Sequence, residues 1–251
     1  SDGYRVITPL RPGSRPLIKH KNIDTKSYEC LSLELNLKVN SIIHCAGLDT
    51  VNSQDYSEIH KANIDLANIV SNWIDLMRPK FHAFMSTVSV YGEIKTDLLR
   101  YDTVPNNPNP YGQSKLISEN ILRQKCAERY VHFLNLRLPG TVGYGSHGNI
   151  ITTIINQLSS SNNTKAKLSL KNPNLKFNNI VCINTLILYV INMMTKFTRQ
   201  GSPAETNLLL GSSNPISFEH VIRVISSLKK ITSSNLIEWS DASTNSFIID
   251  V

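Results

Sequence analysis

Short apolar segments alternate with longer amphipathic ones over the first half of the chain, and this rhythm limits the possible folds more than any other feature. The short segments are rich in β-branched residues and bounded by turn formers, whereas the longer ones repeat apolar residues at helical spacing. We expect strands at residues 4–10, 39–45, 81–90 and 131–138, and helices at 55–76 and 111–129. This order is typical of a doubly wound, Rossmann-like α/β fold with a parallel sheet, whose ligands bind beyond the carboxyl ends of the strands.

The regular alternation of expected strands and helices ends after residue 148. A helix is expected at residues 150–158, and a polar stretch at 159–164 and mixed short elements follow it. We place a lobe boundary within residues 139–148. The chain is therefore predicted to form a Rossmann-like domain at residues 1–140 and a smaller C-terminal lobe at residues 141–251.

Charge and cysteine content narrow the functional classes. The 26 Lys and Arg residues exceed the 19 Asp and Glu residues, but they are scattered and form no basic motif, so nucleic acid is not an expected partner. No apolar stretch of about 18 residues and no signal region occur, so we expect a cytoplasmic protein without membrane contact. The cysteines at positions 30, 45, 126 and 182 lack the close paired spacing of a metal site, so no metal is expected.

The most informative segment is N-P-N-P-Y-G-Q-S-K at residues 107–115. Tyr111 and Lys115 lie four residues apart at the start of an expected helix, so both side chains can reach one cleft. The pattern Y-x-x-x-K is common by chance, and its surroundings decide its meaning. Upstream, Thr87 and Ser89 lie at the carboxyl end of the strand expected at 81–90, where a hydroxyl could hydrogen-bond the oxygen that Tyr111 protonates or deprotonates. The alternative for Thr87 is a strand-end hydroxyl without a catalytic role.

The ordered set of segments resembles a known family. Besides Thr87 and the segment at 107–115, it includes H-C-A-G at residues 44–47, an asparagine within the first long helix, and R-L-P-G-T-V-G at residues 137–143. Together they resemble the extended short-chain dehydrogenase/reductases, the NAD-dependent epimerase/dehydratase family that acts on nucleotide-linked sugars. The resemblance covers nearly the whole chain and implies an NAD(P)-dependent sugar-nucleotide epimerase or reductase.

The resemblance assigns residues to roles. It implies four catalytic residues: Thr87, Tyr111, Lys115 and Asn63. It implies cofactor contacts from Arg11, Asp24, Ala46, Gly47, Lys115 and Pro139. It implies substrate contacts from Thr87, Ser89 and His147. For Asn63 the alternative is a polar side chain that bonds its own helix turn, and for His147 the alternative is a surface histidine.

Two of the cofactor residues bear on which dinucleotide binds. Arg11 stands where the family distinguishes NAD from NADP, and an arginine can pair with a 2′-phosphate, so NADP is slightly favoured; a solvated surface arginine is the alternative. Asp24 resembles the aspartate that meets the adenine.

Tyrosine needs help to act as a base. Its reference pKa is about 10, and lowering it by about three units requires roughly 4 kcal/mol of differential stabilisation. The Lys115 ammonium and a cationic nicotinamide together could supply this, so we expect a lowered pKa for Tyr111.

The glycine-rich turn that usually approaches the dinucleotide pyrophosphate is absent from the printed sequence. The sequence begins where the family's second strand would begin, and it stops where family members usually continue. We expect it to be incomplete at both ends, because a sheet without its central strand leaves backbone groups unpaired.

The choice of reaction remains open between two chemistries. Family dehydratases carry an acidic pair directly after the catalytic Ser/Thr, whereas Val88 and Ser89 stand there in this chain, which disfavours dehydration. Epimerisation and reduction of a keto sugar remain, and both use the same proton transfer by Tyr111. Gly140 stands where many members have an asparagine near the nucleotide, so the nucleotide is not fixed.

Two expectations concern assembly and the alternative function. The helices at 55–76 and 111–129 resemble those that pair into a four-helix bundle in this family, which predicts a homodimer. A non-catalytic dinucleotide-binding sensor of the same fold is the alternative function. The presence of Thr87, Tyr111 and Lys115 together argues against it, because a sensor needs no proton-transfer group.

Overall fold

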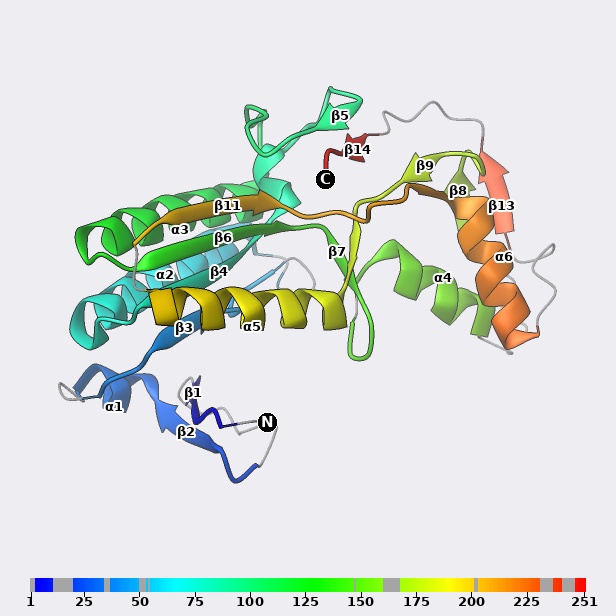
Figure 1. Cartoon of the computed structure of the whole chain (residues 1–251). Coiled ribbons are helices and arrows are strands. Elements are labelled where there is room, and N and C mark those ends of the chain that lie inside the picture. The colour runs from blue at the N-terminus through cyan, green and yellow to red at the C-terminus, as the bar shows by residue number, and fades with distance from the viewer. Residues whose placement is uncertain are drawn as a thin grey trace.

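The computed structural model describes most of the chain. The described residues are 3–10, 20–33, 37–49, 53, 55–146, 148–159, 168–200, 203–230, 237–240 and 247–251. Figure 1 shows that they form a larger part layered around a sheet and a smaller part of helices and short strands beside it.

A parallel sheet forms the centre of the larger part. Its strand order is β11 (Glu205–Leu209), β6 (His132–Leu138), β4 (Phe81–Thr87) and β3 (Ser41–His44). All three pairings are parallel, and Phe81 lies opposite both Ser41 and His132. The expected α/β fold with a parallel sheet is therefore confirmed.

The two N-terminal strands form a separate parallel pair. β1 (Val6–Leu10) pairs with β2 (Ile23–Ser27), and the short helix α1 (Tyr28–Leu33) follows. Among the described residues neither strand pairs with β3, so β3 lies at the edge of the four-stranded sheet.

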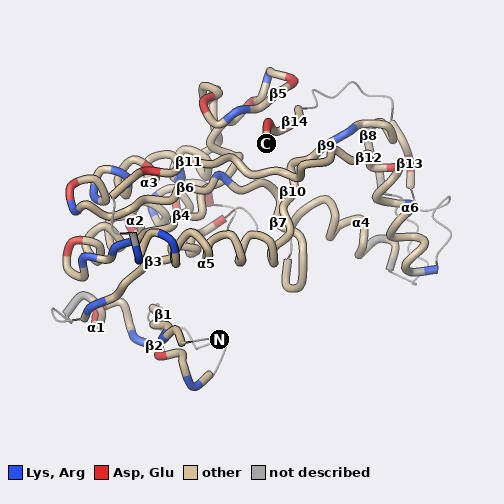
Figure 2. The backbone as a smooth tube through the Cα atoms, viewed as in Figure 1, with Lys and Arg blue, Asp and Glu red and all other residues tan. Residues whose placement is uncertain are grey.

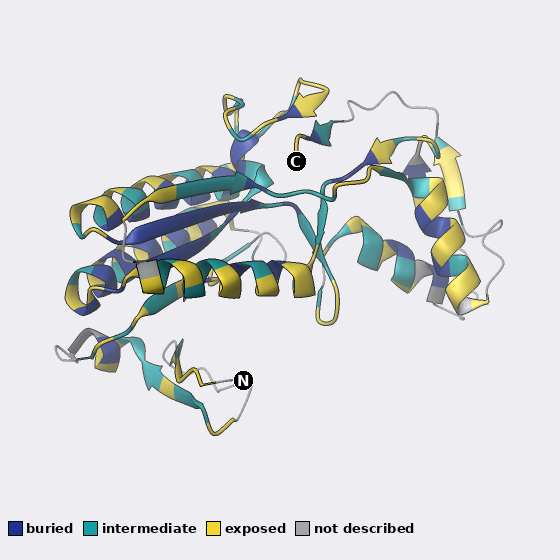
Figure 3. Ribbon diagram, viewed as in Figure 1, coloured by how far each residue is buried: buried dark blue, intermediate teal, exposed yellow. Residues whose placement is uncertain are grey.

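Helices cover both faces of the sheet (Figure 1). α2 (Tyr56–Met77) and α3 (Pro110–Glu128) pack against one face, and α5 (Ile183–Gln200) covers the other. Successive strand side chains point to opposite faces, so Phe84 packs with α2 and α3 while Phe81 packs with α5. β4 and β6 are consequently buried on both sides (Figure 3), as expected for central strands of a doubly wound sheet.

The smaller part has its own apolar core. Its elements are α4 (Ile150–Ser159), α6 (Phe218–Lys229), and the strand pairs β8 (Leu168–Lys171) with β13 (Ile237–Ser240) and β9 (Lys176–Phe177) with β12 (Ile216–Ser217). Ile154, Phe177 and Ile222 are buried together there. Two further pairs are β7 (Gly140–Val142) with β10 (Ile180–Cys182) and β5 (Leu98–Leu99) with β14 (Ile248–Ile249).

The chain crosses between the two parts more than once. α5 and β11 lie C-terminal to the predicted boundary near residue 140, yet they complete the layers around the central sheet. The predicted boundary therefore marks only the first crossing. The division into two domains stays a prediction.

The strand expected at residues 81–90 is shorter in the structure. β4 ends at Thr87, and a 3-10 turn, η1 (Val88–Tyr91), follows. The Thr87 hydroxyl accepts a hydrogen bond from Ser89 N at 3.1 Å, which caps the turn. Gly92, at φ 66°, then lets the chain leave in a left-handed conformation. These contacts override the β-branched character of Val88 and Val90.

Charged residues are unevenly distributed. Figure 2 shows acidic and basic positions mixed along α2 and α3. α4 contains no charged residue, and in α5 Lys196 and Arg199 are the charged positions, both near its end. α4 and most of α5 are therefore held by apolar burial rather than by ion pairs.

Three histidines lie inside the sheet layer: His44, His82 and His132 are all buried. Burial lowers the pKa of His82 to about 4. Burial also holds the pKa of His44 well below its usual range, and the neighbouring His82 and Lys115 lower it further. His82 and His44 are therefore neutral in the folded protein at neutral pH.

We expect the protein to lose stability as the pH falls from about 6.5 towards 4. The pKa of His82 is lower in the folded chain than in the unfolded chain. As the pH falls, the unfolded chain therefore takes up a proton first, which favours unfolding. The stability of the folded chain is undiminished by this effect only above pH 6.5. Protonation of His82 in the unfolded chain should lower the free energy of unfolding by about 2 kcal/mol between pH 6.5 and pH 5. Urea unfolding at pH 7 and pH 5 measures the loss. His82→Phe keeps a ring against Phe133 and should lose less; equal acid losses in both proteins would contradict the assignment.

Candidate active site

The predicted site residues meet at the carboxyl ends of the parallel strands. Ala46 and Gly47 follow β3, Thr87 ends β4, and Pro139 follows β6. Parallel strands place their carboxyl ends along one edge of a sheet, which is where ligands bind in open α/β folds. The start of α3, which carries Tyr111, packs against this edge through η1.

The first turn of α3 is fixed by its cap and by a close backbone contact. Asn109 accepts a hydrogen bond from Gly112 N at 2.8 Å, and Pro110 begins the helix, as both residue types favour. A side chain at Gly112 would bring its Cβ to 2.1 Å from the carbonyl oxygen of Ser89. Only glycine lets the helix start approach η1 this closely, and Tyr111 is placed beside Thr87 as a result.

The Thr87 side chain lies close enough to the Tyr111 hydroxyl to affect its ionisation. The Thr87 hydroxyl donates to Ser89 Oγ at 3.2 Å, so these hydroxyls are grouped at the strand end. The pKa of Tyr111 is raised, first by burial and then by Asp49, while the Thr87 side chain lowers it. The pKa of Tyr111 is therefore raised in the chain without a dinucleotide, and the lowering expected from Lys115 and nicotinamide together stays a prediction.

Lys115 lies one helical turn beyond Tyr111 and is buried. Its Nζ lies 4.2 Å from the centre of the Phe84 ring, a cation–π contact. Burial lowers the pKa of Lys115 to about 8, and Glu119 followed by Cys45 oppose this shift. At neutral pH the side chain therefore remains mostly an ammonium, which can donate hydrogen bonds to a ligand.

Asn63 connects the loop that follows β3 with helix α3 through side-chain hydrogen bonds. Its amide nitrogen donates to Leu48 O at 2.9 Å and to Ser114 Oγ at 3.0 Å, and its amide oxygen accepts from Leu48 N at 2.8 Å. These contacts engage both polar atoms of the side chain. The geometry gives Asn63 a positioning role rather than a bond to its own helix turn.

The remaining predicted contacts are spread more widely. Asp24 lies in β2 and pairs with Arg5, whose Nε donates at 2.8 Å. Ser89 lies beside Thr87. Arg11 and His147 lie outside the described residues, so their predicted roles stay predictions.

The nicotinamide dinucleotide implied by the sequence fits the residues at this sheet edge. A Cβ at Gly47 would lie 3.2 Å from Asn63 Oδ1 and 3.8 Å from Lys115 Nζ, so the glycine leaves open a space beside the ammonium. Hydroxyls at Thr87, Ser89 and Tyr111 supply donors and acceptors for a sugar. The fit concerns the nicotinamide end, since the glycine-rich turn for the pyrophosphate is absent from the printed sequence. In the described part of the chain, no three His, Cys, Asp or Glu side chains are grouped to hold a metal ion.

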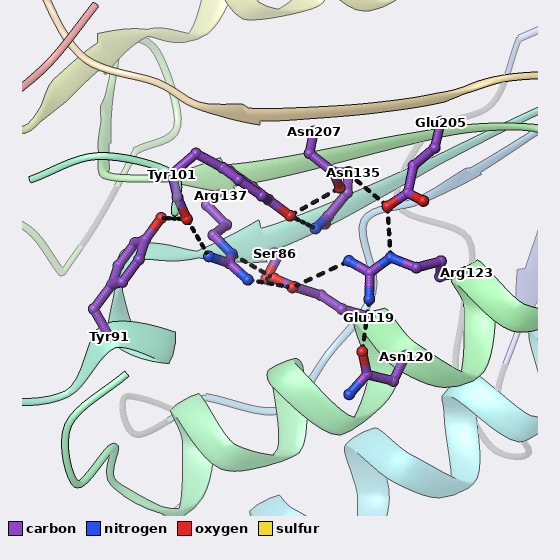
Figure 4. Close-up of polar contacts among 10 residues, drawn as sticks. All are labelled: Ser86, Tyr91, Tyr101, Glu119, Asn120, Arg123, Asn135, Arg137, Glu205 and Asn207. Carbon is purple, nitrogen blue, oxygen red and sulfur yellow. Dashed lines mark hydrogen bonds and ion pairs between the residues drawn. The ribbon is translucent and has the colours of Figure 1, made fainter. Parts of the chain in front are cut away.

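Sequence reasoning missed a buried polar network behind the site, shown in Figure 4. Glu119 and Arg137 form its centre, and Ser86, Tyr91, Tyr101 and other residues surround them. A helical signal could have indicated Glu119, because it lies four residues after Lys115 on the buried face. The partner of Glu119 could not be inferred, since it comes from β6.

No described helix is long and apolar enough to span a bilayer.

Comparison with known protein families shows that residues 2–173 match the sequence model of the "NAD dependent epimerase/dehydratase family". A UDP-glucose 4-epimerase of Dictyostelium discoideum is 34% identical over 91 residues, which cover 36% of this chain and 26% of that protein. A UDP-glucose 4-epimerase of Streptococcus mutans serotype c is 26% identical over 151 residues, covering 58% of this chain and 45% of that protein. The chain thus spans less than half the length of these curated relatives.

Solved structures share the fold. The Bordetella bronchiseptica enzyme WbmH in complex with NAD+ superposes with a TM-score of 0.77 at 15% identity, covering 98% of this chain and 81% of that one. The UDP-Glc/GlcNAc 4-epimerase from Campylobacter jejuni superposes with a TM-score of 0.73 at 16% identity, covering 92% and 76%. At such identities the likeness concerns the arrangement of helices and strands.

Proposed function

The chain belongs to the NAD-dependent epimerase/dehydratase family, and we propose that it acts as an NAD(P)-dependent epimerase or keto-sugar reductase on a nucleotide-linked sugar. The observation that carries the proposal is the grouping of the Tyr111 and Thr87 hydroxyls at the carboxyl end of β4, with Lys115 one turn further along α3. Both UDP-glucose 4-epimerases named above support the substrate class.

In the proposed reaction Tyr111 moves the proton of the reacting sugar hydroxyl. Thr87 hydrogen-bonds the same oxygen and orients it towards the phenol. Lys115 binds the nicotinamide ribose through its ammonium, and its positive charge favours the Tyr111 phenolate. Bound nicotinamide supplies the exchange of hydride with the sugar carbon. Asn63 contributes by holding the loop at residues 46–48 in place.

The surroundings of Tyr111 in the chain alone oppose the loss of its phenolic proton. Burial and Asp49 raise the pKa of Tyr111 in the chain alone, so the phenolate forms only when positive charge outweighs both effects. We propose that ligand binding brings this charge to the site. Proton transfer would then be coupled to the presence of both ligands, which limits side reactions with water.

For the cofactor we propose a nicotinamide dinucleotide. The enzymes WbmH and WbmG of Bordetella bronchiseptica were solved in complex with NAD+ and NAD, respectively, which supports NAD. The slight preference for NADP rests on Arg11 alone. The cytoplasmic location is likewise part of this proposal.

Turnover assays distinguish epimerisation from reduction. We expect full-length protein supplied with UDP-glucose to form its 4-epimer without net change in the absorbance of reduced nicotinamide, because an epimerase returns the hydride. A reductase would consume reduced cofactor in proportion to product. Parallel assays with NAD and NADP test the cofactor, and Arg11→Ala tests the preference. Absence of both activities across hexoses and hexuronic acids linked to UDP and to the other common sugar-carrying nucleotides would contradict the proposed function.

We also propose a homodimer formed through α2 and α3. These helices pack against each other, yet Leu76 on α2 and Ile117 on α3 each remain 39% exposed. Light scattering should give twice the chain mass at micromolar concentration. Ile117→Glu should shift the protein towards monomer, whereas Leu188→Glu on α5, a 62% exposed position on the opposite side of the sheet, should leave the dimer intact. A monomeric wild-type protein would contradict this proposal.

A further inference from the structure

Glu119 is a fully buried carboxylate on α3 that is held from two other elements (Figure 4). Arg137 on β6 donates to it twice, from Nε at 3.0 Å and from Nη2 at 2.8 Å. Ser86 on β4 donates its hydroxyl to Glu119 Oε1 at 2.5 Å. Bidentate pairing fixes the orientation as well as the distance of the two groups.

Arg137 is itself held on both faces. Its guanidinium lies 4.9 Å from the centre of the Tyr91 ring and 4.3 Å from that of Tyr101, and its Nη1 donates to Tyr101 O at 3.0 Å. Two aromatic rings and two ionic hydrogen bonds leave the cation little freedom to move. Glu119 therefore has a rigid partner.

The pair joins the elements that carry the candidate catalytic residues. Glu119 follows Lys115 by four residues on α3, so the two side chains lie on the same helix face. Ser86 directly precedes Thr87 on β4. A shift of Glu119 would thus change the positions of both Lys115 and the end of β4, which carries the Thr87 hydroxyl.

Among the described residues, few charged groups face Lys115. Glu119 faces it from its own helix, and His44 and Cys45 face it from the end of β3. The packed neighbours Phe84 and Asn63 carry no charge. Among these groups Glu119 is the main one that favours the ammonium, and burial opposes it.

We propose that Glu119, held by Arg137 and Ser86, is a positioning residue that keeps Lys115 in its charged form and fixes α3 against the end of β4. The inference rests on the proposed function, because it assigns Glu119 a role through Lys115. A buried ion pair is by itself weak evidence for stability, so a charge-setting role gives a reason for placing these charges inside the protein.

The test measures the titration of Lys115 in the protein without ligands, independently of activity. The ¹³Cε signals of the lysines are followed against pH, and Lys115→Met assigns the signal. The wild-type pKa of Lys115 is expected near 8. In Glu119→Gln it should fall by about one unit, because an attractive charge is lost and Arg137 stays charged. Glu128→Gln is the matched control: this glutamate lies on the same helix and pairs with Lys125, so its loss should leave Lys115 unchanged.

A second variant separates charge from packing. Glu119→Gln combined with Arg137→Met leaves no buried charge without a partner, and the pKa of Lys115 should lie between those of the wild type and Glu119→Gln. If Glu119→Gln does not fold, a lowered pKa in the double variant alone supports the proposal. Equal pKa values in the wild type and in every folded variant would overturn it.

Turnover gives the second readout. If the pKa of Lys115 falls from 8 to 7, the charged fraction falls about fivefold at pH 8 but hardly at pH 6. Glu119→Gln should therefore lose about fivefold in kcat/KM at pH 8 relative to the wild type and less than twofold at pH 6. An equal loss at both pH values would mean that Glu119 only fixes α3 in place, and it would overturn the proposed control of the Lys115 charge. Absence of wild-type turnover together with a shifted Lys115 titration would instead refute the proposed function and leave the charge-setting role of Glu119 standing.

Discussion

Tyr111→Phe should lower kcat by about 10²-fold to 10⁴-fold on the nucleotide sugar that the wild-type protein converts, while the affinity for the dinucleotide stays near the wild-type value. The substitution removes only the hydroxyl and keeps the ring within the first turn of α3. The lost group is the one that lies beside Thr87 and is proposed to carry the proton. A loss confined to kcat is the signature of an interaction made in the transition state.

Controls for Tyr111→Phe separate chemistry from binding. Tyr130→Phe changes a tyrosine that is 78% exposed, and it should leave kcat unchanged. Lys115→Met should damage both kcat and dinucleotide affinity, because the ammonium is assigned to the ribose as well as to the phenolate. Full turnover by Tyr111→Phe would contradict the proposal that Tyr111 transfers the proton, and it would favour the alternative function of a dinucleotide-binding sensor.

The larger elements could be predicted from the sequence because their signals are local. The helix expected at residues 55–76 occupies Tyr56–Met77, and the helix expected at 111–129 occupies Pro110–Glu128. Their apolar residues repeat at helical spacing, and each has a capping residue that the structure uses, Asp55 and Asn109. The four-residue spacing of Tyr111 and Lys115 placed them together for the same reason.

One helix was missed although its signal is local. The helix α5 (Ile183–Gln200) was expected only as mixed short elements. Its apolar residues do recur at helical spacing, and the residues that face the sheet are Leu186, Tyr189, Val190, Met193, Met194 and Phe197. The period was present in the sequence, so the miss reflects the interpretation and not a lack of signal.

The properties of the site depend on contacts that sequence separation hides. The pKa of Tyr111 is raised by burial and by Asp49, more than sixty residues earlier in the chain. Glu119 meets Arg137 because α3 packs across β6, and the sheet must exist before this pairing can be seen. Residue types and local spacing therefore indicated which groups take part, while their charge states required the fold.

Gly112→Ala should lower both stability and activity, although alanine is the better helix former. Helix propensity alone favours alanine by about 1 kcal/mol. The added Cβ, however, would lie 2.1 Å from Ser89 O, and a carbon and an oxygen approach no closer than about 3.3 Å even in favourable contacts. The helix start must retreat from η1 by about 1 Å, so Tyr111 moves away from Thr87.

Overpacking of this kind costs about 1–3 kcal/mol, and a displacement of about 1 Å at the reacting groups can cost about 10²-fold in rate. We therefore expect a net loss of stability in urea unfolding and a fall of about 10²-fold in kcat for Gly112→Ala. Gly140→Ala is the matched control for stability, because its Cβ would meet its nearest neighbour at an ordinary 3.5 Å. Wild-type kcat in a folded Gly112→Ala protein would show that the spacing between α3 and η1 does not set the geometry of the Tyr111–Thr87 pair.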